Sequence, residues 1–269
     1  MGLSQTEIRH FMNHGYVTKS DFFSARETIA LQIEVDRLMR EGALRNVATE
    51  GDGKTMSTTL SNMQLCPMYC HSNLFRALPF HSEVVKAISH LIGDPYILHL
   101  DQVFLKPGGT GMGTHWHQDK AYFRISDPLK GTGVWIAVHD ATIDNGTMQV
   151  IPNSFKTTYE HMRDPYSDHH IRCYPPEDNI DTIELKAGSA LFFSYGTAHC
   201  TGPNKTDKPR AGIAFHFLQT DFAPKKLIEP NRNYRPYITG TNASGGMSEY
   251  GVRVEGTWDS EVEQVLRQA

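Results

Sequence analysis

The sequence predicts a mostly β protein with flanking helices, because helix-like and strand-like patterns fall into separate parts of the chain. Apolar residues recur at helical spacing in the first third, residues 1–95. From residue 96 to about residue 222, short β-like runs alternate with turn residues, which is typical of a sandwich or barrel. A Pro- and Gly-rich extension, 223–269, follows. Because no linker or repeat divides the chain, we expect one domain over residues 1–269.

The expected helices rest on apolar stripes and on the residues that begin and end them. Residues 4–15 start with a serine suited to N-capping and end with a glycine. Residues 24–41 carry an apolar stripe opposite a charged face, and residues 80–93 repeat the pattern before a final glycine. A last short helix is expected to begin at Asp259 or Ser260.

The expected strands are short apolar or alternating runs, and most of them end at turn-forming residues. These runs cover residues 97–106, 133–141, 147–151, 189–194 and 211–219. The first run ends at Pro107-Gly108-Gly109, a strong turn signal. Together the runs supply enough strands for a closed or layered β core.

Composition excludes several classes of protein. A formal net charge of −4 argues against a nucleic-acid-binding surface, which needs a basic face. No stretch approaches the roughly 20 apolar residues of a membrane span, and the start lacks the layout of a secretory signal. Four cysteines are too few for a disulfide scaffold in a chain of this size, so we expect a cytoplasmic protein with reduced thiols.

The densest chemical signal is the segment around His117 and Asp119. Residues two apart on an extended segment point to the same face, so this imidazole and this carboxylate can reach one point in space. Two histidines and one carboxylate form the facial triad of non-haem iron(II) oxygenases. The best third ligand is His199, because it follows the apolar run 190–194 after a turn at Gly196.

Arg210 strengthens this interpretation by its position after the ligands. It stands at the start of the apolar run 211–218, where a guanidinium would be buried. A buried guanidinium binds the distal end of a dicarboxylate through paired hydrogen bonds.

Two rival metal chemistries fit the sequence less well. A cupin site would also use His115, but it needs a glutamate where Ala121 and Tyr122 stand. His115 lies on the same face as His117, so we expect it near the metal without binding it. A halogenase would replace the carboxylate of Asp119 with a small residue.

Several segments occur in an order and spacing typical of one family. They are Leu3-Ser4-Gln5, His14-Gly15-Tyr16-Val17, Asp101-Gln102-Val103-Phe104-Leu105-Lys106-Pro107, His117-Gln118-Asp119, Val134-Trp135-Ile136-Ala137-Val138, Asn145-Gly146-Thr147-Met148-Gln149-Val150-Ile151-Pro152, and Phe192-Phe193 through His199 to Arg210. Over almost its whole length, the chain resembles the phytanoyl-CoA dioxygenase-like family of iron(II)- and 2-oxoglutarate-dependent oxygenases. It departs where Asn153-Ser154-Phe155 follows Ile-Pro, since the family commonly has Gly-Ser-His in this loop near the mouth of the site.

The resemblance implies a fold and a set of ligands. The implied fold is a single-domain double-stranded β-helix, a cupin-like jelly roll with helices against one side. Iron(II) would be held by His117, Asp119 and His199, and the distal carboxylate of 2-oxoglutarate by Arg210 and Thr201. Two further residues, Trp135 and Gln102, would line the co-substrate pocket.

The implied activity is hydroxylation by O₂, with release of succinate and CO₂. We expect a small polar or anionic metabolite as substrate, because Lys106, Lys120 and Arg124 flank the iron motif and can receive an anionic group. Asn62 and Met63 are expected to help form a lid. The alternatives are a CoA thioester or natural-product scaffold, with desaturation, epoxidation or cyclisation as the outcome. A non-catalytic metal-binding protein on the same fold is the alternative of another class.

Overall fold

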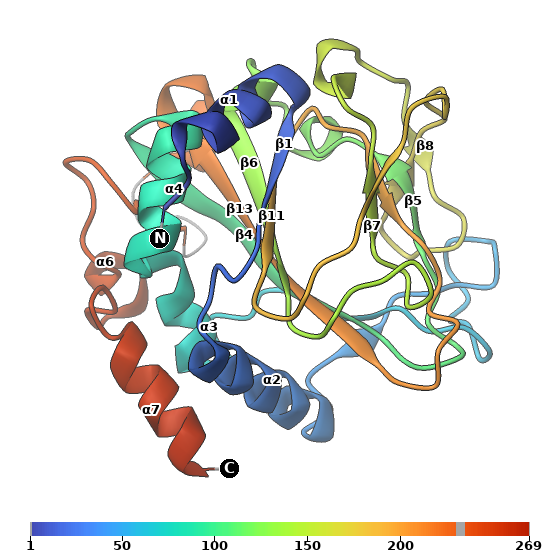
Figure 1. Cartoon of the computed structure of the whole chain (residues 1–269), viewed down its shortest axis with the longest axis horizontal. Helices are drawn as coiled ribbons and strands as arrows, with labels where there is room; N and C mark the ends of the chain where they lie inside the picture. The colour runs from blue at the N-terminus through green and yellow to red at the C-terminus, as the bar shows by residue number, and fades with distance from the viewer. Residues whose placement is uncertain (1, 230–234, 269) are drawn as a thin grey trace.

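Two antiparallel sheets face one another in the computed structural model, which describes residues 2–229 and 235–268. The larger sheet has the order β1-β11-β6-β13-β4-β3-β2 and the smaller one the order β10-β7-β12-β5. Helices gather on the outer face of the larger sheet, and the smaller sheet lies on the other side (Figure 1). The prediction of a mostly β, jelly-roll fold with flanking helices is confirmed.

The strands of the larger sheet come from every part of the described chain except its end. They are β1 (Tyr16–Lys19), β2 (Arg45–Asn46), β3 (Met63–Leu65), β4 (Tyr96–Lys106), β6 (Gly131–Ala137), β11 (Ala190–Ser194) and β13 (Arg210–Gln219). The strands of the smaller sheet are β5 (Thr114–His117), β7 (Met148–Val150), β10 (Asp181–Ile183) and β12 (His199–Thr201). A separate hairpin pairs β8 (Met162–Arg163) with β9 (Ile171–Arg172).

Four of the helices in the described chain correspond to helices expected from the sequence, namely α1 (Gln5–His14), α2 (Ala25–Arg40), α4 (Ser82–Ile92) and α7 (Trp258–Gln268). The helices α3 (Asn73–Ala77), α5 (Lys120–Phe123) and α6 (Met247–Tyr250) were not predicted. Ser4 and Ser24 begin the first two with capping boxes, in which the serine hydroxyl accepts from a backbone N–H and a glutamate returns the bond. The helix expected from residue 80 begins instead at Ser82, because Leu78–Phe80 forms a separate 3₁₀ turn around a proline.

The first third of the chain is not purely helical, since β1, β2 and β3 extend the larger sheet at both edges. These strands are two to four residues long, too short to show a strand period in the sequence. β3 pairs with β4 in the register Gln64↔Phe104, so this edge becomes part of the wall between the sheets.

Strand alternation divides the apolar side chains between two cores. On β6, Val134 and Ile136 belong to the core shared with the helices, while Trp135 and Ala137 belong to a smaller core between the sheets. That second core leaves a cavity of about 350 Å³, lined by side chains from both sheets. The alternation therefore turns one face of every central strand toward the site.

Candidate metal centre and co-substrate pocket

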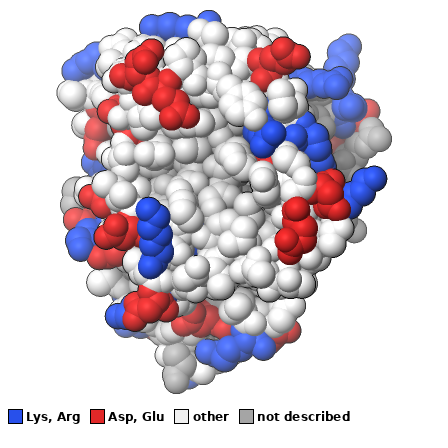
Figure 2. Space-filling view, turned by 90° about the vertical axis from the view of Figure 1, so that its right-hand side faces the viewer, with Lys and Arg blue, Asp and Glu red and all other residues white. Residues whose placement is uncertain are grey.

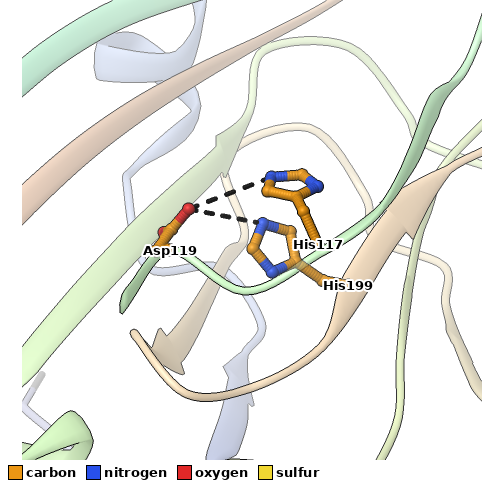
Figure 3. A group of neighbouring side chains, drawn as sticks. All are labelled: His117, Asp119 and His199. Carbon is orange, nitrogen blue, oxygen red and sulfur yellow. Dashed lines mark ion pairs between the residues drawn. The ribbon is translucent and has the colours of Figure 1, made fainter. Parts of the chain in front are cut away.

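The metal-binding candidates come from two paired strands of the smaller sheet. His117 is the last residue of β5 and His199 the first of β12, and the antiparallel register sets them directly opposite each other. Their ring centroids lie 4.2 Å apart. Asp119 lies two residues after His117, where the backbone turns helical at the start of α5. One ligand atom from each of the three residues lies within 4.8 Å of the others (Figure 3).

Hydrogen bonds to the backbone orient both imidazoles. Nδ1 of His117 lies 2.8 Å from the His115 carbonyl, and Nδ1 of His199 lies 2.9 Å from the Thr197 carbonyl. Because a carbonyl can only accept, each Nδ1 donates and each Nε2 is left with a free lone pair. Both Nε2 atoms lie 3.9 Å from Oδ1 of Asp119. The three free ligand atoms thus face a common point.

Burial and mutual charge give these groups the protonation that metal binding requires. Burial lowers the pKa of His199 to about 4 and also lowers the pKa of His117, so both rings are neutral at pH 7. Burial alone would raise the pKa of Asp119, but nearby imidazoles, that of His216 first, bring it below its usual value. Two neutral imidazoles and one carboxylate are the donor set of a facial triad, and they fit iron(II).

Two further residues, His216 and Gln118, contact the candidate ligands or the backbone that carries them, and neither was given a role from the sequence. Nε2 of His216 lies 3.1 Å from Oδ2 of Asp119, the oxygen that does not face the two ligand histidines. Gln118 is fully buried, and its amide nitrogen donates to the carbonyls of Gly196, Ser154 and Thr157. The sequence does hold a signal for His216, because it stands an even number of residues after Arg210 on one strand and therefore shares its face.

The cavity brings together most of the residues singled out from the sequence. His117, Asp119, His199, Arg210, Thr201, Trp135, Gln102, Asn62 and Lys106 all line it. Lys120 and Arg124 do not belong to its lining. The Lys120 ammonium donates instead to Thr157 O and Thr158 Oγ1, both at 2.9 Å. His115 also lies outside this lining, with Nδ1 2.7 Å from Oδ2 of Asp164, contrary to the expectation that it stays near the metal.

The part of the cavity beside Thr201 holds two buried cations side by side. Arg210 and Lys106 are cross-strand partners on β13 and β4, and their residues are 1% and 2% exposed. Nζ of Lys106 donates to Thr201 Oγ1 at 2.7 Å, and both cations donate to the carbonyl of Gly146. The guanidinium of Arg210 lies 5.4 Å above the ring of Trp135.

Neither cation has a carboxylate partner within the described part of the chain. Burial lowers the pKa of Arg210 to about 10, so the guanidinium remains charged at neutral pH. Burial also lowers the pKa of Lys106 well below its ordinary value, and repulsion from Arg210 adds to this, so an anion bound beside it would stabilise the ammonium form. A buried charge is costly without a counterion, so this end of the cavity suits an anionic ligand such as a carboxylate. Lys106 was expected to receive an anionic group of the substrate, and its ammonium lies beside Thr201 and Arg210 at this end of the cavity.

A jelly roll whose cavity carries both a His-Asp-His cluster and a buried arginine defines a class. It is the class of mononuclear non-haem iron oxygenases that bind a dicarboxylate co-substrate. The model of the phytanoyl-CoA dioxygenase (PhyH) family matches residues 11–212, and this chain belongs to that family.

Curated relatives share low identity over most of the chain. Ectoine dioxygenase of Bordetella bronchiseptica is 21% identical over 248 residues, which cover 83% of this chain and 79% of the relative. Phytanoyl-CoA dioxygenase of Arabidopsis thaliana is 26% identical over 223 residues, covering 81% of this chain and 75% of the relative.

Solved structures share the fold. EctD from S. alaskensis with 2-oxoglutarate and 5-hydroxyectoine has a TM-score of 0.66 at 22% identity, covering 82% of this chain and 77% of that one. The epimerase SnoN in complex with Fe³⁺, alpha ketoglutarate and nogalamycin RO has a TM-score of 0.69 at 20% identity, covering 85% of this chain and 90% of that one.

Proposed function

We propose that this chain, an iron(II)- and 2-oxoglutarate-dependent dioxygenase of the PhyH family, hydroxylates a small polar metabolite with His117, Asp119 and His199 as the iron ligands. The observation that carries the residue assignment is the pair of buried cations, Arg210 and Lys106, in the same cavity as the metal cluster. One molecule of 2-oxoglutarate has two carboxylates, and a cavity with a metal and two buried cations provides a partner for each.

Each residue of the co-substrate end has a distinct part in this proposal. Arg210 and Lys106 bind the distal carboxylate, and the hydroxyl of Thr201 lies within hydrogen-bonding distance of Lys106 to complete the cradle. The indole of Trp135 lies beneath the guanidinium of Arg210 and fixes its direction. Iron(II) and 2-oxoglutarate, once bound, supply the oxidising chemistry, in which O₂ is consumed and succinate and CO₂ are released. The protein contributes geometry and the exclusion of water.

The size of the cavity supports a small substrate over a CoA thioester. Its volume of about 350 Å³ lies at the lower end of the range for small-molecule sites and must hold the co-substrate as well. Relatives named ectoine dioxygenase and phytanoyl-CoA dioxygenase represent the two possibilities. Other reaction outcomes are the alternative, because an epimerase and a carbocyclase from nogalamycin biosynthesis share this fold. A purely metal-binding protein would have no use for the two buried cations.

We also propose a cytoplasmic enzyme that acts on free small molecules and not on nucleic acid or membranes. All four cysteines are unpaired, as in a reducing compartment. In the described ranges, no helix combines the length and apolar character needed to cross a bilayer. Figure 2 shows basic and acidic side chains interspersed around a largely uncharged centre, without a continuous basic stripe on that face.

The proposal is tested by replacing Arg210 with methionine, which keeps length but removes the charge. We expect the affinity for 2-oxoglutarate to fall about 100-fold, equivalent to about 2.7 kcal/mol, because one carboxylate loses its paired donors. Iron(II) affinity should stay within about threefold, since Arg210 is not a ligand. Isothermal titration without O₂ measures both affinities.

Lys186→Met is the matched control, because its ammonium is exposed and pairs with Asp140 on the surface. It should leave both affinities unchanged. Equal 2-oxoglutarate affinity in the Arg210→Met variant and the wild type would reject the assignment of the co-substrate end.

A further inference from the structure

Two cavity-lining amides carry buried oxygen atoms that have no hydrogen-bond partner. Asn62 is 2% exposed and Gln64 is 6% exposed, and both line the cavity. Within the described residues, Oδ1 of Asn62 and Oε1 of Gln64 are buried acceptors without a donor. Native proteins rarely leave such atoms unpaired, because burying an unsatisfied polar group is costly. Two of them on one wall of a ligand cavity point to a ligand that supplies the missing donors.

Local structure holds these amides in place before any ligand arrives. Gln64 lies in β3 and Asn62 just before it, so the two side chains share one face of the strand. Asn46 fixes the backbone at this point, since its Oδ1 accepts from the backbone N–H of Asn62 at 2.9 Å. Nε2 of Gln64 donates to Oε1 of Gln102 at 2.7 Å, which joins the wall to β4. Such preorganised acceptors favour binding because little ordering is left to be done.

This wall is separate from the co-substrate end. Gln102 and Lys106 point to the same face of β4 and are four residues apart, which corresponds to roughly 13 Å along a strand. Lys106 is opposite Arg210 in the sheet, whereas Gln102 is opposite Ala214. The amides therefore line a part of the cavity that the distal carboxylate of 2-oxoglutarate does not need.

Among the described residues that line the cavity, the cation nearest the wall in the sheet is Arg45, which is opposite Gln64 and largely exposed. Arg45 lines the cavity but forms an ion pair with Asp168, and His169 lies 2.5 Å from the same carboxylate. Lys120 and Arg124 do not contribute to the cavity lining. The acceptors of the wall are neutral amide oxygens, which bind O–H or N–H donors without requiring a charge.

We propose that Asn62 and Gln64, with Gln102, form the substrate-recognition wall, and that the substrate is a small uncharged molecule presenting at least two O–H or N–H donors. This inference rests on the proposed function, since it assigns the part of the cavity left beside iron and 2-oxoglutarate. It replaces two expectations from the sequence: an anionic group received by lysine and arginine side chains, and Gln102 as part of the co-substrate pocket.

The substrate class is tested on the wild-type enzyme loaded with iron(II) and 2-oxoglutarate. A library of small metabolites is screened for stimulation of O₂-dependent succinate release, with neutral polyols and amides set against carboxylates and phosphates of matched size. We expect the strongest stimulation from uncharged molecules with two or more donors. A hit set led by anions, or one with no uncharged donor, overturns the inference.

A second test measures the stability and ligand binding of variants in the substrate-recognition wall, and it does not depend on catalysis. Asn62→Leu is nearly isosteric and removes an unpaired acceptor, so the melting temperature of the metal-free protein should stay unchanged or rise by about 2–4 °C. Binding of the best library hit, measured by titration without O₂, should weaken at least tenfold in this variant and in Gln64→Met. A fall of several degrees in melting temperature for Asn62→Leu would instead indicate a structural amide and reject the recognition role.

Gln149→Leu is the matched control, because Gln149 lies on β7 and is absent from the lining of the cavity. It should not change the binding of the hit. Titration with 2-oxoglutarate separates the two proposals: if the wild type does not bind 2-oxoglutarate, the proposed function fails. If it binds 2-oxoglutarate with normal affinity while uncharged donors do not stimulate succinate release, only the substrate inference fails.

Discussion

Gln118 shows how a single buried amide can determine the geometry of a metal centre. It lies between His117 and Asp119, and its amide nitrogen serves three backbone carbonyls, that of Gly196 at 2.6 Å. Its Oε1 accepts from the backbone N–H of Tyr159 at 3.2 Å. These bonds tie the end of β5 to the turn before β12 and to the loop that follows Ser154, so they hold the ligand-bearing segments together.

We therefore expect Gln118→Leu to destabilise the protein by about 3 kcal/mol, because several buried carbonyls lose their donor. Iron(II) affinity should fall at least tenfold as the ligands lose their relative placement. Thermal unfolding and metal titration measure the two effects. Gln149→Leu, at a half-buried glutamine outside the cavity lining, should leave iron(II) affinity unchanged. A Gln118→Leu enzyme with wild-type iron affinity would show that the backbone alone places the ligands.

The role of a residue was predictable from the sequence where a local pattern determines where its side chain points. His117, Asp119 and His199 converge as the sequence indicated. The pairing of β5 with β12 sets the two histidines opposite each other, while Asp119 joins them from a residue where the backbone has turned helical. Lys106 could not be placed from sequence, since a lysine at a strand end is usually solvated and nothing local reports that β13 brings Arg210 beside it. His115 was misjudged for a similar reason, because its partner Asp164 lies in a distant loop.

The connection from α1 to β1 helps to position β12, the strand that begins with His199. Gly15 ends the helix with a φ of +86°, and its carbonyl accepts from the hydroxyl of Thr197 at 2.7 Å. A Cβ at Gly15 would lie 2.6 Å from atoms of Phe155 and Thr197. Thr197 in turn supplies the carbonyl that orients His199.

Gly15→Ala should consequently cost about 3 kcal/mol, more than backbone strain alone, and should also weaken iron(II) binding. Gly42→Ala is the matched control, because Gly42 has a φ of +70° and no described atom lies within 4 Å of the place that a Cβ would take. That variant should cost only about 1–2 kcal/mol and leave metal affinity unchanged. Equal effects of the two substitutions on unfolding would contradict the packing argument.

Helices long enough to repeat their apolar pattern several times were predictable from the sequence, whereas strands of two or three residues were not. The helices expected over 4–15 and 24–41 match α1 and α2, since capping serines and apolar stripes act locally. By contrast, β2 and β3 have two and three residues and form because β4 offers an edge. This edge carries the amide wall, so the part of the site that we assign to substrate recognition was the hardest to foresee from sequence.

At the scale of the whole molecule, buried neutral histidines couple stability to pH. Burial lowers the pKa of both His99 and His170 to about 3, against an ordinary value of 6.5. The unfolded chain therefore binds more protons than the folded protein between about pH 3 and pH 6.5. Stability from these residues is complete above about pH 7 and declines as the pH falls below 6.5.

We expect the melting temperature of the metal-free protein to be level above about pH 7 and to fall steadily from pH 6.5 to pH 4. A His170→Gln variant should show a shallower fall, because its amide does not titrate. Differential scanning calorimetry at a series of pH values measures both curves, and parallel curves would contradict the assignment to His170. The same scans check the expectation of one domain over 1–269, which predicts a single cooperative transition.

The imidazoles of His117 and His199 are oriented by the same kind of backbone hydrogen bond, and this has a consequence for evolution. Each donates from Nδ1 to the carbonyl two residues earlier in its own segment, His115 O for His117 and Thr197 O for His199. Every amino acid supplies that carbonyl, so ligand orientation does not depend on which side chain precedes the ligand. Lineages that diverge at position 115 can thus exchange its imidazole for other chemistries, and adapt the neighbourhood of the cavity, while inheriting an intact metal centre.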